Sequence, residues 1–235
     1  MVDWAFVRRQ VETHEIQQLP TPARLRSLIL AAIQSGIVLP GTRLKEIELG
    51  AAFEVSRTPL REALAALKAE QILEVDAEGL RVRTLGWHDI TALYELRASL
   101  EVLAAGLAAQ RANDVERQII DNICREEEFL INANVNPVDL ANHNKRFHHA
   151  ILQAAGNQFL NEAIERLARM MVLTGATAYS VRERVITIRT EHIAINDAIQ
   201  GQDKDRAHAA MQLHLTNALE ARLTLLSRAG GIEVD

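Results

Sequence analysis

Apolar residues near the start of the chain recur with the spacing of a helix. In "TPARLRSLILAAIQSG" they return every three or four positions, which predicts a helix that ends at Gly36. A Pro-Gly pair in "VLPGTRL" predicts a turn, and residues 45–53 fit a short second helix. A third helix begins at Ser56. The apolar faces predicted for the first and third helices are Leu25, Leu28, Ile29, Ala32 and Ile33, and Leu60, Ala63, Leu64 and Leu67.

The third helix begins with an unusual combination of residues, "VSRTPLREALAALK". Ser56 is a predicted N-cap. Pro59 falls in the first turn, where its missing N–H breaks no helical hydrogen bond. Arg57 and Arg61 are one turn apart and lie off the apolar face, so we expect both to point outward.

After the third helix the apolar spacing changes to every second residue. Leu80 and Val82 alternate with Arg81 and Arg83, and residues 76–79 supply turn formers, so "ILEVDAEGLRVRTL" predicts a β-hairpin. Three helices followed by a hairpin make a winged helix-turn-helix, expected over residues 21–85. Residues 1–20 are a polar leader to which the pattern assigns no element.

From Trp87 onward every predicted element is a helix. Breaks fall at Asn-Pro 136–137, at Gly156-Asn157 and at Gly201. We therefore predict a mainly α fold, in which the winged domain precedes an all-α bundle of about six helices over residues 86–235. The predicted helices cover residues 87–110, 114–133, 137–155, 157–179, 181–200 and 203–228.

Composition indicates an ordinary soluble protein, with 48% hydrophobic and 24% charged residues. The low aromatic content, 4%, argues against recognition by rows of stacked bases. The single cysteine, Cys124, excludes an intrachain disulfide and suits a reducing compartment. With neither a signal peptide nor an apolar run of membrane length, we expect a cytoplasmic protein without membrane contact.

Charge divides unevenly between the two predicted domains. Residues 1–85 carry 11 Lys and Arg against 11 Asp and Glu, whereas residues 86–235 carry 15 against 20. The net charge of −5 therefore belongs entirely to the second domain. The acidic total does not exclude nucleic acid as a partner of the first domain.

The third helix has the features of a DNA-reading helix. In a helix-turn-helix the second helix of the motif enters the major groove and its N-terminal residues reach bases and phosphates. The hydroxyls of Ser56 and Thr58, with the positive helix N-terminus, can hold a phosphate. The guanidinium of Arg57 or Arg61 can form two hydrogen bonds to guanine.

The hairpin offers two further arginines, Arg81 and Arg83, to the DNA backbone or minor groove. The competing interpretation is that the arginines are merely solvated, with Arg61 paired to a neighbouring glutamate, and such surface pairs stabilise little. That interpretation would be favoured for an isolated helix. The preceding turn and short helix and the following hairpin favour DNA binding instead.

Two long segments resemble a known family. "LPGTRLKEIELGAAFEVSRTPLREALAALKAEQILEV" resembles the DNA-binding half of GntR-family transcriptional regulators, and the chain from "ELRASLEVLAAGLAA" onward resembles the FCD ligand-binding domain of the FadR-like branch. Together they cover about residues 20 to 228. The resemblance implies that Arg57 and Arg61, with Thr58 beside them, contact operator DNA. The chain departs from the family pattern at Gly50, commonly alanine, and at Gln71, usually the glycine that ends the recognition helix.

Histidines form a second group of interest. Asn144 and His148 are four residues apart and share a helix face, while His192 and His214 lie on two later helices. Three imidazoles and an oxygen ligand in a helical bundle would suit Zn²⁺ or another first-row ion, although spacing alone fits surface or core histidines as well. The other histidines of this region fall off the shared faces: His143, His149 and His208.

The resemblance implies a divalent metal site made by these same four residues, with Zn²⁺ expected and Ni²⁺ or Mn²⁺ as alternatives. Asn144 stands where the family commonly has aspartate, so the ligand set is neutral and leaves more of the coordination to an anionic effector. The resemblance further implies a small organic acid as that effector. Arg97 is a candidate second anchor for its carboxylate, and an intrahelical pair with Glu101 is the equal alternative.

We therefore expect a sequence-specific transcriptional regulator, a repressor, that binds double-stranded operator DNA as a homodimer formed through the helical domain. A metal-sensing regulator is one alternative. Another is a metal-dependent hydrolase or lyase with the ion on His148, His192 and His214. Glu191 precedes His192 and projects about 100° away from it on a helix, so the sequence offers that enzyme no general base.

Overall fold

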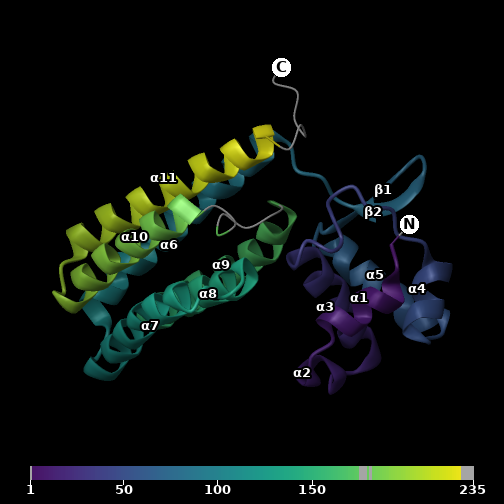
Figure 1. Cartoon of the computed structure of the whole chain (residues 1–235), viewed down its shortest axis with the longest axis horizontal. Coiled ribbons are helices and arrows are strands. Elements are labelled where there is room, and N and C mark those ends of the chain that lie inside the picture. Colours follow the sequence, from purple (N-terminus) through teal and green to yellow (C-terminus); the bar gives the residue numbers. More distant parts are fainter. Residues whose placement is uncertain (1, 175–178, 180–181, 229–235) are drawn as a thin grey trace. The chain divides into compact units, whose positions relative to one another are not determined.

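A computed structural model describes residues 2–174, 179 and 182–228, which form two compact units (Figure 1). Residues 2–86 and 168–174 make the N-terminal unit, and most of the rest, from Trp87 on, makes the C-terminal unit. Helices dominate both. Among the helices that the structure describes, none combines the length and apolar composition needed to cross a bilayer.

The N-terminal unit has the predicted three-helix and hairpin order, preceded by two additional helices. The nine predicted core residues of the first and third helices are all buried, which confirms their apolar faces. The hairpin is antiparallel and pairs Leu73 with Val82 and Asp76 with Gly79. The elements are α1 (Trp4–Val11), α2 (His14–Gln17), α3 (Thr21–Gln34), α4 (Glu46–Phe53), α5 (Arg57–Ala69), β1 (Leu73–Asp76) and β2 (Gly79–Val82).

The leader that the sequence left without an element is helical and packs on this unit. The Asp3 carboxylate accepts a hydrogen bond from the Phe6 N–H and caps α1. Trp4 is 3% exposed, and its ring meets that of Phe53 edge-on, with 6.0 Å between centroids. Trp4, Val7 and Val11 are buried on one face of α1. An eight-residue helix is marginal alone, so it is this packing that stabilises α1.

Ser56 is the N-cap residue of α5, as predicted, but its hydroxyl does not cap the helix. Ser56 occupies the N-cap position in extended conformation, but its side chain makes no capping hydrogen bond. A capping hydroxyl bonds to the N–H two or three residues on, and the third residue here is Pro59, which has no N–H. At the other end, Gln71 has φ +60°, the left-handed conformation that glycine adopts without strain.

The C-terminal unit contains the six expected helices, with one notable difference. The helix predicted over residues 157–179 ends at Met171 and continues as a 3₁₀ turn, where the Thr174 hydroxyl donates to the Met171 carbonyl at 2.8 Å. Residues 175–178 and 181 of the predicted helices lie outside the described residues. The helices are α6 (Trp87–Arg111), α7 (Asp114–Asn132), α8 (Pro137–Ala154), α9 (Gln158–Met171), α10 (Arg182–Gln200) and α11 (Lys204–Arg228), whereas the last residues of α9 and all of η1 (Val172–Thr174) belong to the N-terminal unit.

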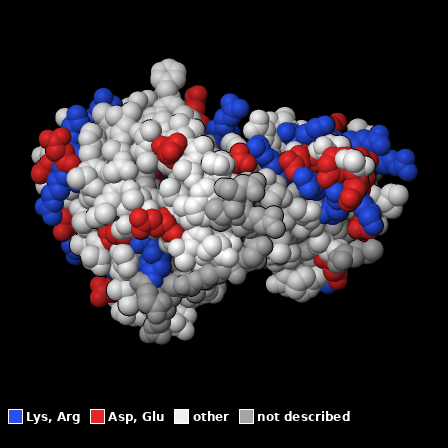
Figure 2. Space-filling view, turned by 90° about the horizontal axis from the view of Figure 1, so that it is seen from above, with Lys and Arg blue, Asp and Glu red and all other residues white. Residues whose placement is uncertain are grey.

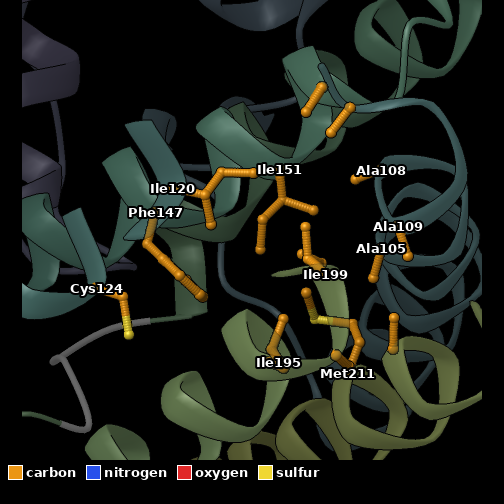
Figure 3. Close-up of a cluster of buried hydrophobic side chains, with 14 of the residues drawn as sticks. Ala105, Ala108, Ala109, Ile120, Cys124, Phe147, Ile151, Ile195, Ile199 and Met211 are labelled. Atoms are coloured by element: carbon orange, nitrogen blue, oxygen red, sulfur yellow. The ribbon is translucent and has the colours of Figure 1, made fainter. Parts of the chain in front are cut away.

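The bundle core is built from small and β-branched side chains (Figure 3). Alanines on α6 let α11 approach closely, and a Cβ at Gly106 would lie 1.9 Å from His208 Nε2, so the His208 ring would have to move to make room for it. Phe147 fills the centre from α8 and is fully buried. The next residue, His148, is thereby directed towards α10 and α11, so this packing brings its imidazole to those of His192 and His214.

Candidate DNA-binding surface and metal centre

The first turn of α5 presents its polar residues to solvent. Ser56, Arg57 and Thr58 are exposed, and no ion pair involves Arg57 among the described residues. Arg61 Nε donates to Glu46 Oε2 at 2.9 Å, and the two side chains are 65% and 41% exposed. The pair that the competing interpretation anticipated is thus present. It lies in solvent, where it is weak and can exchange for a phosphate.

The wing arginines are more constrained than the sequence suggested. Arg81 is half-buried, donates to Glu74 at 2.7 Å and lies 3.3 Å from Asp76. Arg83 follows the end of β2 and donates to the Gln71 side chain at 3.2 Å. A further arginine, Arg43, pairs with Asp76 and Glu78. Basic and acidic side chains are accordingly intermixed over the N-terminal unit, on the right of Figure 2.

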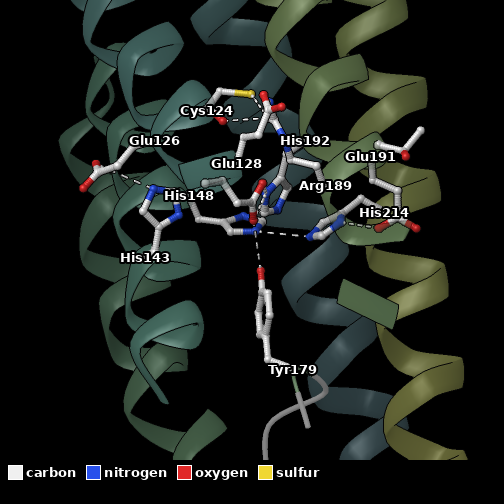
Figure 4. A network of polar contacts seen from close by, with 12 residues as sticks. Cys124, Glu126, Glu128, His143, His148, Tyr179, Arg189, Glu191, His192 and His214 are labelled. Atoms are coloured by element: carbon white, nitrogen blue, oxygen red, sulfur yellow. Dashed lines mark hydrogen bonds and ion pairs between the residues drawn. The ribbon is translucent and has the colours of Figure 1, made fainter. Parts of the chain in front are cut away.

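Three predicted ligands meet in the interior of the C-terminal unit (Figure 4). His148 comes from α8, His192 from α10 and His214 from α11, and one ring nitrogen of each lies within 4.8 Å of the others. His148 Nε2 and His214 Nε2 are 3.2 Å apart. His192 Nε2 is buried without a hydrogen-bond partner among the described residues.

A glutamate stands behind each of these imidazoles, at Nδ1. His192 Nδ1 is 3.0 Å from both carboxylate oxygens of Glu127 on α7. His214 Nδ1 is 2.7 Å from Glu191 on α10, and His148 Nδ1 is 2.5 Å from Glu101 on α6. A carboxylate that holds Nδ1–H leaves the Nε2 lone pair free to face the centre of the cluster.

Burial and hydrogen bonding set the charge states in the cluster. Burial lowers the pKa of His214 to about 3 and also lowers the pKa of His192, so both rings are neutral at pH 7. Burial raises the pKa of Glu191, but hydrogen bonds from His214, Arg184 and Asn217 outweigh it and bring that pKa to about 2. Burial likewise opposes the ionisation of Glu127, but the hydrogen bond from His192 outweighs it and lowers that pKa. Neutral imidazoles next to ionised carboxylates are the states that a metal site requires.

The fourth predicted ligand, Asn144, lies on the same helix as His148, one turn before it. Asn144 is half-buried on α8, and its side chain makes no hydrogen bond among the described residues. Arg97 Nε donates to Glu101 Oε1 at 2.6 Å, so the intrahelical pair given above as the alternative to effector binding is present. His143 is buried 3.7 Å from Glu126, and His149 is exposed.

Two domain families match the chain in the order of its two units. The family of bacterial regulatory proteins called gntR matches residues 22–79, and the FCD domain matches residues 92–217, more than half of the chain. The chain belongs to the GntR family. It is a DNA-binding transcriptional regulator with an FCD domain, and neither family consists of enzymes.

Curated relatives are regulators of similar length. An uncharacterized HTH-type transcriptional regulator, YdhC of Bacillus subtilis, is 27% identical and covers 86% of this chain and 91% of its own length. The Nta operon transcriptional regulator of Aminobacter aminovorans is 28% identical and covers 81% and 89%. The solved structure of Escherichia coli McbR/YncC has a TM-score of 0.73 at 19% identity, over 91% of this chain and all of that chain, and supports the GntR fold.

Within this GntR regulator, sequence reasoning missed the three glutamates. Glu101 was noted as a partner of Arg97 alone, and Glu127 lies unremarked in the run "REEEF". Sequence reasoning considered Glu191 only in relation to His192, from which it projects away on α10, whereas in the structure it contacts His214 of the neighbouring helix. The position of Glu191 one residue before His192 does not reveal its role in the sequence, because the histidine that Glu191 contacts, His214, is on another helix.

Proposed function

We propose that this GntR regulator is a repressor whose affinity for operator DNA is controlled by a small organic acid at a metal site in the FCD domain. A homodimer formed through that domain would present two winged helices to a pseudo-palindromic operator. The observation that carries the metal site is the convergence of three imidazole nitrogens, one of them, His192 Nε2, buried and without a partner among the described residues.

DNA recognition is proposed to lie in the first turn of α5. Arg57 is exposed and without an ion pair among the described residues, and Arg61 is held only by a solvent-exposed glutamate. The helix N-terminus and the hydroxyl of Thr58 would position a phosphate beside them. Because Arg81 is paired with Glu74, we assign Arg81 and Arg83 the lesser role of backbone contacts.

The donor set fits a borderline divalent cation. His148, His192 and His214 would hold it through nitrogen, which suits Zn²⁺ and also Ni²⁺, and three protein ligands leave coordination positions for other groups. Such a cation supplies, when bound, a positive charge that a carboxylate can coordinate. Asn144, one turn from His148 on the same helix, is the proposed oxygen ligand, and its weak neutral oxygen would be easily displaced.

Arg97 is the proposed second anchor of the effector. Its side chain is 15% exposed, and it holds Glu101, which contacts His148. An effector carboxylate that took Arg97 from Glu101 would therefore act on the carboxylate behind a metal ligand. Arg97 would thus bind Glu101 in the effector-free domain and the effector in the bound domain. Such a difference in contacts between two states is what allosteric control requires.

Burial favours a resident ion over a sensor of free metal. The side chains of His192 and His214 are 1% and 4% exposed, and that of His148 is 11%. An ion enclosed to this degree exchanges slowly, whereas a sensor must exchange its ion with the cell. The organic acid, rather than the metal, is therefore proposed as the signal.

Elemental analysis of purified variants tests the site. His148→Ala and His192→Ala should each lower the metal content and the melting temperature together. His149→Ala, on the same helix but exposed, is the matched control and should retain both. Metal content equal to that of the parent in both site variants would refute the metal site.

A second experiment tests the effector. Operator DNA is first selected from random sequences, and organic acids are then screened for the ability to release the protein from that DNA.

A further inference from the structure

The three glutamates behind the histidines differ in their other partners. Glu101 is also bound by Arg97, at 2.6 Å, and Glu191 by Arg184, at 2.6 and 2.9 Å. Each of these carboxylates therefore has its charge balanced by an arginine. Glu127 is the exception.

Glu127 is a buried carboxylate whose hydrogen bonds come from neutral groups. Its side chain is 1% exposed, His192 Nδ1 lies 3.0 Å from both carboxylate oxygens, and the Tyr179 hydroxyl donates to Oε1 at 3.5 Å. Among the described residues no lysine or arginine lies within 4.0 Å of it, the ion-pair distance. The charge of Arg189 acts on Glu127 only from beyond that distance. A buried carboxylate without a direct ion pair is costly, so a cation closer by is expected.

We propose that Glu127 is the positioning residue that sets the affinity of the triad for a divalent cation, by supplying negative charge through the His192 ring. This inference rests on the proposed metal site. The imidazoles and Asn144 are all neutral ligands, so none of them balances the charge of the ion. The Glu127 carboxylate fixes the proton on Nδ1, aims Nε2 at the centre and makes that nitrogen a stronger donor.

The neighbours of Glu127 in sequence cannot take this role. Glu126 and Glu128 flank it on α7, and their side chains are 43% and 66% exposed. Glu126 pairs with Arg146 and Glu128 with Arg189. Of the three consecutive glutamates, only the middle one is hydrogen-bonded to a histidine of the triad among the described residues, so Glu128 provides a control one residue away.

The decisive measurement is the Zn²⁺ affinity of Glu127→Gln, obtained by competition with a chromophoric chelator. Glutamine keeps the shape and the acceptor oxygen for Nδ1–H but removes the charge. We expect affinity about 10–100-fold below the parent, the range typical of such outer partners. Glu128→Gln should bind like the parent.

Thermal melting with and without Zn²⁺ separates this role from a structural one. If Glu127 acts on the ion, Glu127→Gln melts near or above the metal-free parent but gains much less from Zn²⁺. If it merely supports the fold, the metal-free variant melts lower and the gain from Zn²⁺ is unchanged, which overturns the inference.

Two further outcomes are distinguishable. A parent that binds no Zn²⁺ overturns the proposed site together with the role of Glu127, whereas a parent and variant of equal affinity overturn the role alone. If the Glu127→Gln variant does not fold, nitrogen-15 NMR spectra of the Zn²⁺-loaded parent test the inference instead, by showing which ring nitrogen of His192 carries the proton. They should show His192 protonated at Nδ1, and protonation at Nε2 instead would contradict the inference.

Discussion

The Arg61 guanidinium donates to the Glu46 carboxylate across the α4–α5 turn, with 2.9 Å between Nε and Oε2. If Arg61 contacts operator DNA as proposed, Glu46 competes with the DNA for Arg61 and adds a negative charge near the duplex. We predict that Glu46→Gln strengthens operator binding several-fold, because both effects are removed. Fluorescence anisotropy with operator DNA would measure it, and Glu220→Gln on α11 is the charge-matched control. Weaker binding by Glu46→Gln would place Arg61 away from the DNA.

Arg57 is exposed at the first position of α5 and has no ion pair among the described residues. Arg57→Ala should weaken operator binding by about 1–3 kcal/mol if it reads a base. If it contacts a phosphate, the loss should be uniform across sequences and the log–log salt slope should fall by about 1. Titrations at several salt concentrations distinguish the two. Unaltered affinity at every salt concentration would remove Arg57 from the interface.

Gly50 lies inside α4, where a Cβ would meet Val55 O at 3.6 Å and Leu60 Cδ2 at 3.8 Å, both ordinary contacts. Gly50→Ala should therefore stabilise the N-terminal unit by about 0.5–1 kcal/mol, because alanine loses less backbone entropy in a helix. Chemical denaturation would measure the change. The contrasting substitution is Gly106→Ala in α6, which should destabilise because its Cβ would overlap His208. Destabilisation by Gly50→Ala would mean that α4 needs glycine for a reason other than space.

Trp4 anchors α1 against Phe53, at the end of α4. Removing a large buried aromatic side chain leaves a cavity, so Trp4→Ala should cost about 3–5 kcal/mol in the unfolding of this unit. It should also weaken DNA binding by loosening the turn before α5. Phe6→Ala on the same helix is the control, because Phe6 is 46% exposed. Equal stability of the two variants would show that α1 does not support the motif.

The pKa of His214 lies near 3 in the folded protein, against 6.5 in an exposed histidine. Below pH 6.5 the unfolded chain therefore binds a proton that the folded chain does not. This contribution to stability is complete above about pH 6.5 and is lost as the pH falls towards 3. The metal-free protein should melt progressively lower from pH 7 to pH 5, and His214→Gln should flatten that profile. A parallel decline in both proteins would assign the acid sensitivity to other groups.

Periodicity identified the buried faces of α3 and α5 and the hairpin, because burial of one helix face or alternation in a strand is encoded locally. It also selected His148, His192 and His214 with the help of the family resemblance. The helix of residues 4–11 was overlooked although Asp3, Trp4, Val7 and Val11 carry its cap and apolar spacing. Eight residues are too short a stretch for that pattern to be distinctive.

By itself, then, the sequence determined a winged helix-turn-helix followed by a helical bundle, and exposed arginines at the start of its reading helix. Only the tertiary structure decided that Glu101, Glu127 and Glu191 each stand behind one histidine. The physical reason is that spacing fixes which residues share a face of one helix. The rotation and register of one helix against another depend on how all the side chains of the bundle pack together.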